Sequence, residues 1–70
     1  METQRGTIIA LLWNRGYGFI RAEDGKDIYF NEAACIMPAD FRDLREGHEV
    51  EFVVTEDRKG RPRAIGVVVR

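Results

Sequence analysis

Tyr17 and Phe19 are the residues of this chain best placed to bind a flat ligand, because two large rings stand two positions apart close to Arg15. Successive side chains of a β-strand point to opposite faces, so residues two apart share a face. Exposed rings beside a cation would stack on the planar bases of single-stranded nucleic acid. The same spacing also suits half of a hydrophobic core, so the orientation of this face decides between the two interpretations.

The neighbouring polar residues indicate which way the rings point. Residues 16–22 and 27–31 have strand character and are joined by Asp24-Gly25, a pair typical of hairpin turns. One face combines rings with charged or amide side chains: Tyr17, Phe19, Arg21, Asp27, Tyr29 and Asn31. The other face is apolar: Ile20, Ala22, Ile28 and Phe30. Because burying an unpaired charge is costly, the face with the rings is expected to point outward.

An outward cluster of Tyr17, Phe19 and Tyr29 has two interpretations. A contiguous apolar patch on a small domain is typical of a binding site. Gly16 and Gly18 would then leave room for a base to approach the rings. The alternative is ring packing between strands that only stabilises the sheet.

The elements that must position these residues are short strands. Residues 13–16 are expected to form a tight connection, 32–36 a short helical turn, and 41–47 a loop, with a break at Pro38 and Ala39. Five segments have strand character: 6–12, 16–22, 27–31, 48–55 and 63–69. This number fits a five-stranded, partly open barrel. The sequence therefore predicts one all-β domain over residues 1–70, a five-stranded antiparallel Greek-key barrel (OB-fold).

Composition narrows the class of protein. The chain has 70 residues, of which 44% are hydrophobic and 33% charged, as in ordinary globular domains. No apolar run approaches the roughly 18 residues of a membrane span. The lone Cys35 favours a reducing, cytoplasmic location. The lone His48 has no partner for a metal site, and no nucleophile–base pair indicates an enzyme. We therefore expect no cofactor, no metal and no catalysis.

Charge is unevenly distributed along the chain. The net charge is −1, yet residues 58–70 contain five cations and no anion. A local patch of this kind attracts a polyanion whatever the total charge. Four of these cations, Arg58, Lys59, Arg61 and Arg63, surround Gly60 and Pro62 in a basic loop. The loop is expected either to contact phosphates, with a strong salt dependence, or to be a solvated hairpin tip.

Several motifs together resemble the bacterial cold-shock domain. Residues 6–8 (Gly-Thr-Ile) resemble the family's opening Gly-Thr-Val, and residues 15–20 (Arg-Gly-Tyr-Gly-Phe-Ile) its Lys-Gly-Phe-Gly-Phe-Ile motif. Residues 27–30, 41–52 and 59–64 are similar to its later motifs. The resemblance implies a barrel that binds single-stranded RNA or DNA by base stacking. Residues 15–20 also resemble the RRM signature, but only 14 residues precede Arg15, too few for that fold.

The chain also departs from the family pattern. Ile9, Ala10, Leu11 and Leu12 replace a basic residue and aromatic residues of the usual first strand. Asn31-Glu32 replaces the usual His-Phe. Each lost stack removes roughly 1–3 kcal/mol, so weaker binding than in typical members is expected. The predicted stacking residues are Trp13, Tyr17, Phe19, Tyr29 and Phe41, and the predicted polar contacts are Arg15, Asn31, Lys59, Arg61 and Arg63. For Trp13, capping the barrel end is the alternative.

Two hypotheses of function follow. The first is a monomeric binding protein for single-stranded RNA or DNA, of the RNA chaperone or regulator type. The second is a cold-shock-like barrel that binds another protein, or a second domain of a longer chain, through the aliphatic Ile9–Leu12 surface.

Overall fold

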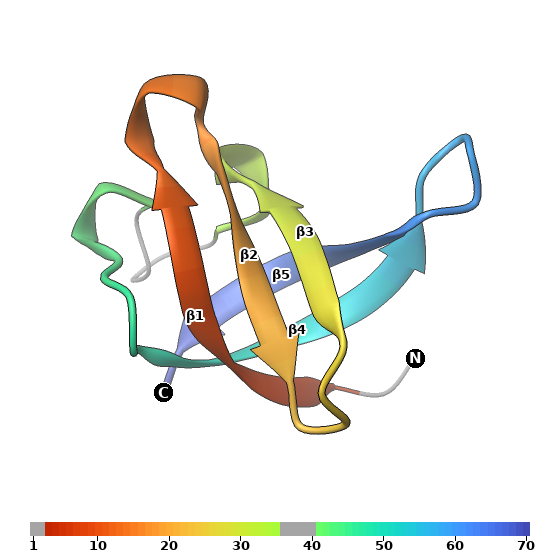
Figure 1. The fold of residues 1–70 in the computed structure, drawn as a ribbon, viewed down its shortest axis with the longest axis horizontal. Coiled ribbons are helices and arrows are strands. Elements are labelled where there is room, and N and C mark those ends of the chain that lie inside the picture. The colour runs from red at the N-terminus through yellow and green to blue at the C-terminus, as the bar shows by residue number, and fades with distance from the viewer. Residues whose placement is uncertain (1–2, 36–40) are drawn as a thin grey trace.

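Five strands close into a barrel in the order β1-β2-β3-β5-β4 (Figure 1). The computed structural model describes residues 3–35 and 41–70. The strands are β1 (Gln4–Leu12), β2 (Tyr17–Ala22), β3 (Asp27–Asn31), β4 (Glu49–Glu56) and β5 (Pro62–Val69). Each of these strands begins and ends within two residues of its predicted position. The predicted all-β barrel is therefore confirmed.

One pair of strands departs from the predicted antiparallel arrangement. β3 and β5 pair in parallel, with Tyr29 opposite Arg63 and Phe30 opposite Ala64. The other four pairs are antiparallel. A closed ring of five strands cannot alternate direction throughout, because five is odd, so one pair must be parallel. This pairing places the start of β5, and the basic loop before it, beside the ring-bearing face of β3.

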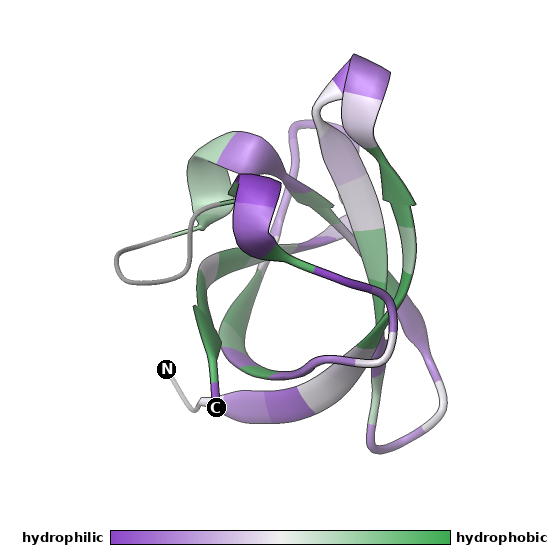
Figure 2. Cartoon of the chain, turned by 90° about the vertical axis from the view of Figure 1, so that its left-hand side faces the viewer, coloured by the Kyte–Doolittle hydropathy of each residue, from purple (hydrophilic) through white to green (hydrophobic). Residues whose placement is uncertain are grey.

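Short 3₁₀ helices connect the strands, and no α-helix occurs in residues 3–35 and 41–70. They are η1 (Trp13–Arg15), η2 (Glu32–Ala34) and η3 (Phe41–Asp43). The predicted turn at residues 32–36 is confirmed for Glu32–Ala34. The predicted break at Pro38 and Ala39 lies outside the described residues. Hydrophilic segments concentrate in the connections around the ring of strands (Figure 2).

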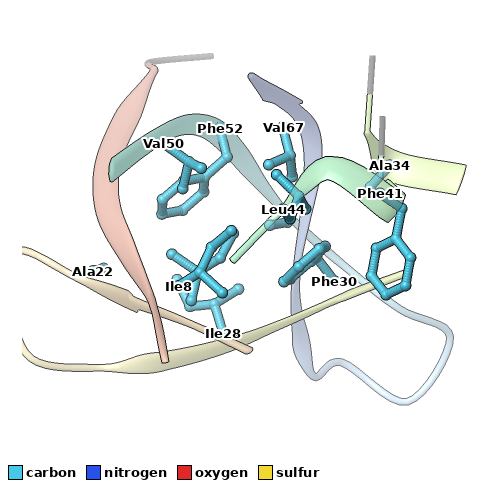
Figure 3. Close-up of a cluster of buried hydrophobic side chains, with 12 residues drawn as sticks. Ile8, Ala22, Ile28, Phe30, Ala34, Phe41, Leu44, Val50, Phe52 and Val67 are labelled. Atoms are coloured by element: carbon cyan, nitrogen blue, oxygen red, sulfur yellow. The ribbon is translucent and has the colours of Figure 1, made fainter. Parts of the chain in front are cut away.

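The core fills the barrel and reaches η2, η3 and the segment after η3 (Figure 3). It consists of Ile8, Ile20, Ala22, Ile28, Phe30, Ala34, Phe41, Leu44, Val50, Phe52, Ala64 and Val67, each at most 7% exposed. The four predicted inward residues of β2 and β3 are all among them. Alternation of side chains in these strands therefore sets which face is buried, and it leaves the ring-bearing face outside.

The aliphatic run of β1 follows an irregularity in the strand. The register between β1 and β2 shifts between Ile8 and Ala10, which is a β-bulge. Such a bulge interrupts the regular alternation of faces. Ile9, Ala10, Leu11 and Leu12 are each half-buried, and Leu11 packs against the core. Protein docking through this run stays a prediction.

Candidate nucleic-acid interface

Three rings form a cluster on the outer face of β2 and β3. Phe19 lies opposite Tyr29 in the β2–β3 register, and Tyr17 lies opposite Asn31. The ring centroids are 5.4 Å apart for Tyr17–Tyr29, 6.1 Å for Tyr17–Phe19 and 6.2 Å for Phe19–Tyr29. These distances lie within the usual range for aromatic pairs. Each side chain is half-buried, so the cluster combines mutual packing with accessible ring surface.

The glycines beside the rings have structural roles that differ from the predicted one. A Cβ atom at Gly18 would lie 2.5 Å from the carbonyl oxygen of Ala10 and 3.0 Å from the Phe30 ring. Gly18 thus allows β1 and the core to approach β2 closely, and it does not face an incoming base. Gly16 has φ of 74°, which ends η1 in the left-handed conformation that favours glycine. The prediction that these glycines leave space for a ligand is therefore wrong for Gly18.

Asn31 lies beside the ring cluster, but part of its side chain is engaged. Its Oδ1 accepts a hydrogen bond from the backbone N–H of Ala33 at 2.9 Å, which caps η2. Its Nδ2 donates to the hydroxyl of Tyr29 over 3.4 Å. The amide therefore orients Tyr29 and begins η2, and it retains donor capacity for a ligand.

Phe41 is buried, contrary to its predicted exposure as a stacking residue. Its side chain is 5% exposed, and its ring lies 6.0 Å from that of Phe30. Figure 3 shows it at one end of the core cluster. The ring fills the barrel end, because the segment that carries Phe41 folds over this opening and supplies Leu44 to the same core.

Trp13 is the exposed large hydrophobic residue of the described chain, at 45% exposure. Its ring packs edge-on against Phe41 at 5.3 Å. The guanidinium of Arg45 lies 5.7 Å from its ring centroid, which is a cation–π distance. These contacts support the capping interpretation of Trp13 and still leave part of the ring open to solvent. Arg15 is exposed in η1, two residues before Tyr17.

A negative charge lies next to Gly16, just before β2 begins. Glu32 is exposed at the start of η2, and its backbone N–H donates to the carbonyl of Gly16 at 2.8 Å. A Cβ atom built at Gly16 would lie 3.1 Å from the Glu32 carboxyl carbon. This carboxylate therefore lies beside Gly16, the residue that precedes Tyr17 in the chain.

Asp57 organises the basic loop, a role that the sequence analysis did not assign. Its Oδ1 accepts from the backbone N–H of Lys59 at 2.8 Å and of Arg61 at 2.9 Å. Its Oδ2 pairs with Arg61 Nε at 2.9 Å. The hydrogen bonds from Arg61 and Lys59 lower the pKa of Asp57. An Asp three residues before Gly60 was the available signal, since aspartate commonly accepts backbone hydrogen bonds in turns.

The four loop cations are therefore not equivalent. Arg61 is neutralised by Asp57, although its side chain is 69% exposed. Arg58 and Lys59 are exposed. Arg63 lies at the start of β5 and is half-buried. In Figure 1 the loop projects from the β4–β5 end of the barrel, beyond β3.

A surface pocket joins the rings to the loop. It has a volume of about 500 Å³ and is lined by Phe19, Asp27, Tyr29, Asp57, Arg61, Pro62 and Arg63. Phe19, Tyr29 and Arg63 occupy one row across β2, β3 and β5. Adjacent strands lie about 4.8 Å apart, so a base on the rings is within reach of the arginine. Stacking surface, hydrogen-bond donors and acceptors thus share one site.

Metal sites and membrane-spanning helices are two further features that the described residues can be searched for. Among residues 3–35 and 41–70, no three His, Cys, Asp or Glu side chains gather closely enough to hold a metal ion. In the same part of the chain, no helix is long and apolar enough to cross a membrane.

Fold and site together define a class: a small OB-type barrel with an aromatic outer face next to a basic loop. Comparison with known proteins is more specific. Residues 4–70 match the family described as the 'Cold-shock' DNA-binding domain, so the chain belongs to the cold-shock domain family. Membership supports nucleic-acid binding as the general class of function.

Curated relatives agree with this assignment. The chain is 43% identical over 65 residues to the cold shock-like protein of Aquifex aeolicus, covering 93% of this chain and 91% of that protein. It is 38% identical over 65 residues to cold shock protein CspB of Geobacillus stearothermophilus, covering 93% and 96%. It is 38% identical over 66 residues to cold shock domain-containing protein 4 of Arabidopsis thaliana, covering 94% of this chain and 33% of that protein.

Proposed function

We propose that this chain binds single-stranded nucleic acid, RNA or DNA, by stacking bases on Tyr17, Phe19 and Tyr29. The observation that carries the proposal is the pocket that joins Phe19 and Tyr29 to Arg61 and Arg63. Aromatic rings supply stacking that does not depend on base identity, and nearby cations supply attraction to the backbone. In this proposal the chain acts as an RNA chaperone or regulator and catalyses no reaction. It works as a monomer in the cytoplasm.

The proposed contacts differ in strength. Lys59, and Arg15 at the other end of the face, are exposed cations suited to phosphates. Arg61 is already paired with Asp57, so its guanidinium would attract a phosphate less strongly than an unpaired cation. Asn31 would donate a hydrogen bond from its Nδ2 to a base. Trp13 would stack on a base only if the bound oligonucleotide extends to the η1 end of the barrel. Phe41 is not included, because it is buried.

Affinity below that of typical family members is part of the proposal. Glu32 places a carboxylate beside Gly16, next to Tyr17. The half-buried Leu11 and Leu12 offer no planar ring at the β1 side of the face. Each missing stack removes roughly 1–3 kcal/mol of binding free energy.

A fluorescence titration tests the proposal. Emission of Trp13 and the tyrosines is followed while a pyrimidine-rich heptanucleotide is added at low and at moderate salt. We expect saturable quenching whose dissociation constant rises with salt, because phosphate contacts release counterions. Unchanged emission up to high micromolar oligonucleotide, at both salt concentrations, would refute the proposal.

A further inference from the structure

Arg63 differs from the other arginines of the pocket and its rim. Arg21 pairs with Asp27 at 2.9 Å, and Arg61 pairs with Asp57 at the same distance. The side chain of Arg63 has no hydrogen-bond or ion-pair partner within the described parts of the chain, and its Nε is buried and unsatisfied. A guanidinium with unmet donors beside a stacking surface has unused capacity to bind a ligand.

The ion pairs around the pocket single out Arg63 as the donor left for a ligand. Its lining contains two carboxylates, Asp27 and Asp57, and two guanidiniums, Arg61 and Arg63. Each carboxylate is already paired with an arginine, Asp27 with Arg21 and Asp57 with Arg61, which leaves the charge of Arg63 uncompensated in the lining. Arg63 can therefore donate either to a phosphate or to the acceptors of a base edge.

The position of Arg63 also matches a stacked base. Tyr29 lies between Phe19 and Arg63 in the row across three strands. Because neighbouring strands lie about 4.8 Å apart, a base stacked over Tyr29 would turn one edge toward Arg63. The planar fork of arginine matches two adjacent acceptors. Guanine presents such a pair in O6 and N7, whereas adenine presents one acceptor and one donor there.

We propose that Arg63 makes this pocket a guanine-selective subsite, with the guanidinium donating to O6 and N7 of a base stacked on the Phe19–Tyr29 rings. The inference rests on the proposed function and adds a base preference to it.

A base scan tests the inference. A thymidine heptanucleotide is changed at each position in turn to guanine, adenine or 7-deazaguanine, and each dissociation constant is measured. Adenine and guanine stack similarly, and 7-deazaguanine lacks only the N7 acceptor. At the best position we expect guanine to bind roughly tenfold more tightly than adenine, and 7-deazaguanine to lose most of this preference.

Two variants locate the preference. Arg63→Gln is expected to lose the preference for guanine, because a side-chain amide matches the N6–N7 edge of adenine at least as well. Arg63→Lys, which can still donate to O6 and N7 but lacks the planar fork, is expected to keep only part of the preference. Lys59→Gln is the matched control, and it is expected to weaken all oligonucleotides by one common factor while preserving the preference. Thermal melts establish that each variant is folded.

The outcomes separate the two proposals. Equal, saturable binding of guanine and adenine oligonucleotides would overturn the guanine subsite and leave the proposed function standing. A uniform loss of affinity in Arg63→Gln, with the preference intact, would also overturn it and assign Arg63 to a phosphate. No binding of any oligonucleotide would overturn the proposed function itself, and the subsite with it.

Discussion

Replacing Phe19 with alanine is expected to impair binding much more than folding. One lost stack removes roughly 1–3 kcal/mol, which raises the dissociation constant roughly 5- to 150-fold. Truncating a fully buried Phe costs about 3–5 kcal/mol of stability, and Phe19 is half-buried, so about 2 kcal/mol is expected. A domain of 70 residues has about 3.5–10 kcal/mol in total. The variant should therefore remain folded.

Phe41→Leu is the matched control, since it removes a ring that the structure places in the core. Phe41 makes edge contacts with Trp13 at 5.3 Å and Phe30 at 6.0 Å. Aromatic pairs of this kind contribute about 0.5–1.5 kcal/mol each, so about 1–3 kcal/mol of stability is lost. For a domain of this size, each kcal/mol lowers Tm by about 4–8 °C. The dissociation constant should change by less than about twofold, because the ring does not reach the ligand.

The assay pairs thermal melts by circular dichroism with fluorescence titrations at a temperature where both variants are folded. The reasoning fails if Phe41→Leu weakens binding as much as Phe19→Ala, because the predicted stacking role of Phe41 would then be correct. It also fails if Phe19→Ala leaves binding unchanged.

Three further variants test separate parts of the account. Glu32→Gln should tighten oligonucleotide binding about two- to threefold at low salt, because it removes a charge that repels phosphates. The gain should disappear at high salt, where this repulsion is screened. An unchanged dissociation constant at low salt would contradict this role of Glu32. Gly18→Ala should lower stability by about 1–3 kcal/mol in denaturant titrations, because its Cβ would lie 2.5 Å from the carbonyl oxygen of Ala10 in β1 and 3.0 Å from the Phe30 ring; unaltered stability would show that β1 and β2 can separate at no cost. The pKa of Asp57 is lowered on folding below its ordinary value of 3.8, so its stabilisation is present above that pH and is lost as pH falls through the folded value. The difference in Tm between wild type and Asp57→Asn should therefore narrow as the pH is lowered through and below 3.8, and a constant difference would contradict the assignment.

Side-chain alternation predicted the ring-bearing face correctly because β2 and β3 are regular. Ile20 and Phe30 are fully buried, while Arg21 remains exposed. The charge on Arg21 is what excluded that face from the core. A single regular hairpin therefore sufficed to orient Tyr17, Phe19 and Tyr29.

Other features had no local signal. Phe41 lies in a short 3₁₀ helix, where no alternation distinguishes inside from outside, and its assignment came from family resemblance alone. The bulge after Ile8 depends on the pairing of β1 with β2, which a single strand does not reveal. The pocket around Arg63 requires the parallel β3–β5 pairing, and only closure of the whole barrel produces that contact. Long-range pairing thus determined most of what the sequence left open.

Mapping the bound surface by NMR tests the central claim most directly. Backbone amide shifts of the ¹⁵N-labelled protein are followed during titration with a pyrimidine-rich heptanucleotide. We expect the largest changes in β2 and β3 around Tyr17, Phe19 and Tyr29, with further changes near Lys59 and Arg63. Saturable changes confined to the aliphatic residues of β1, with the ring-bearing face unaffected, would contradict the account.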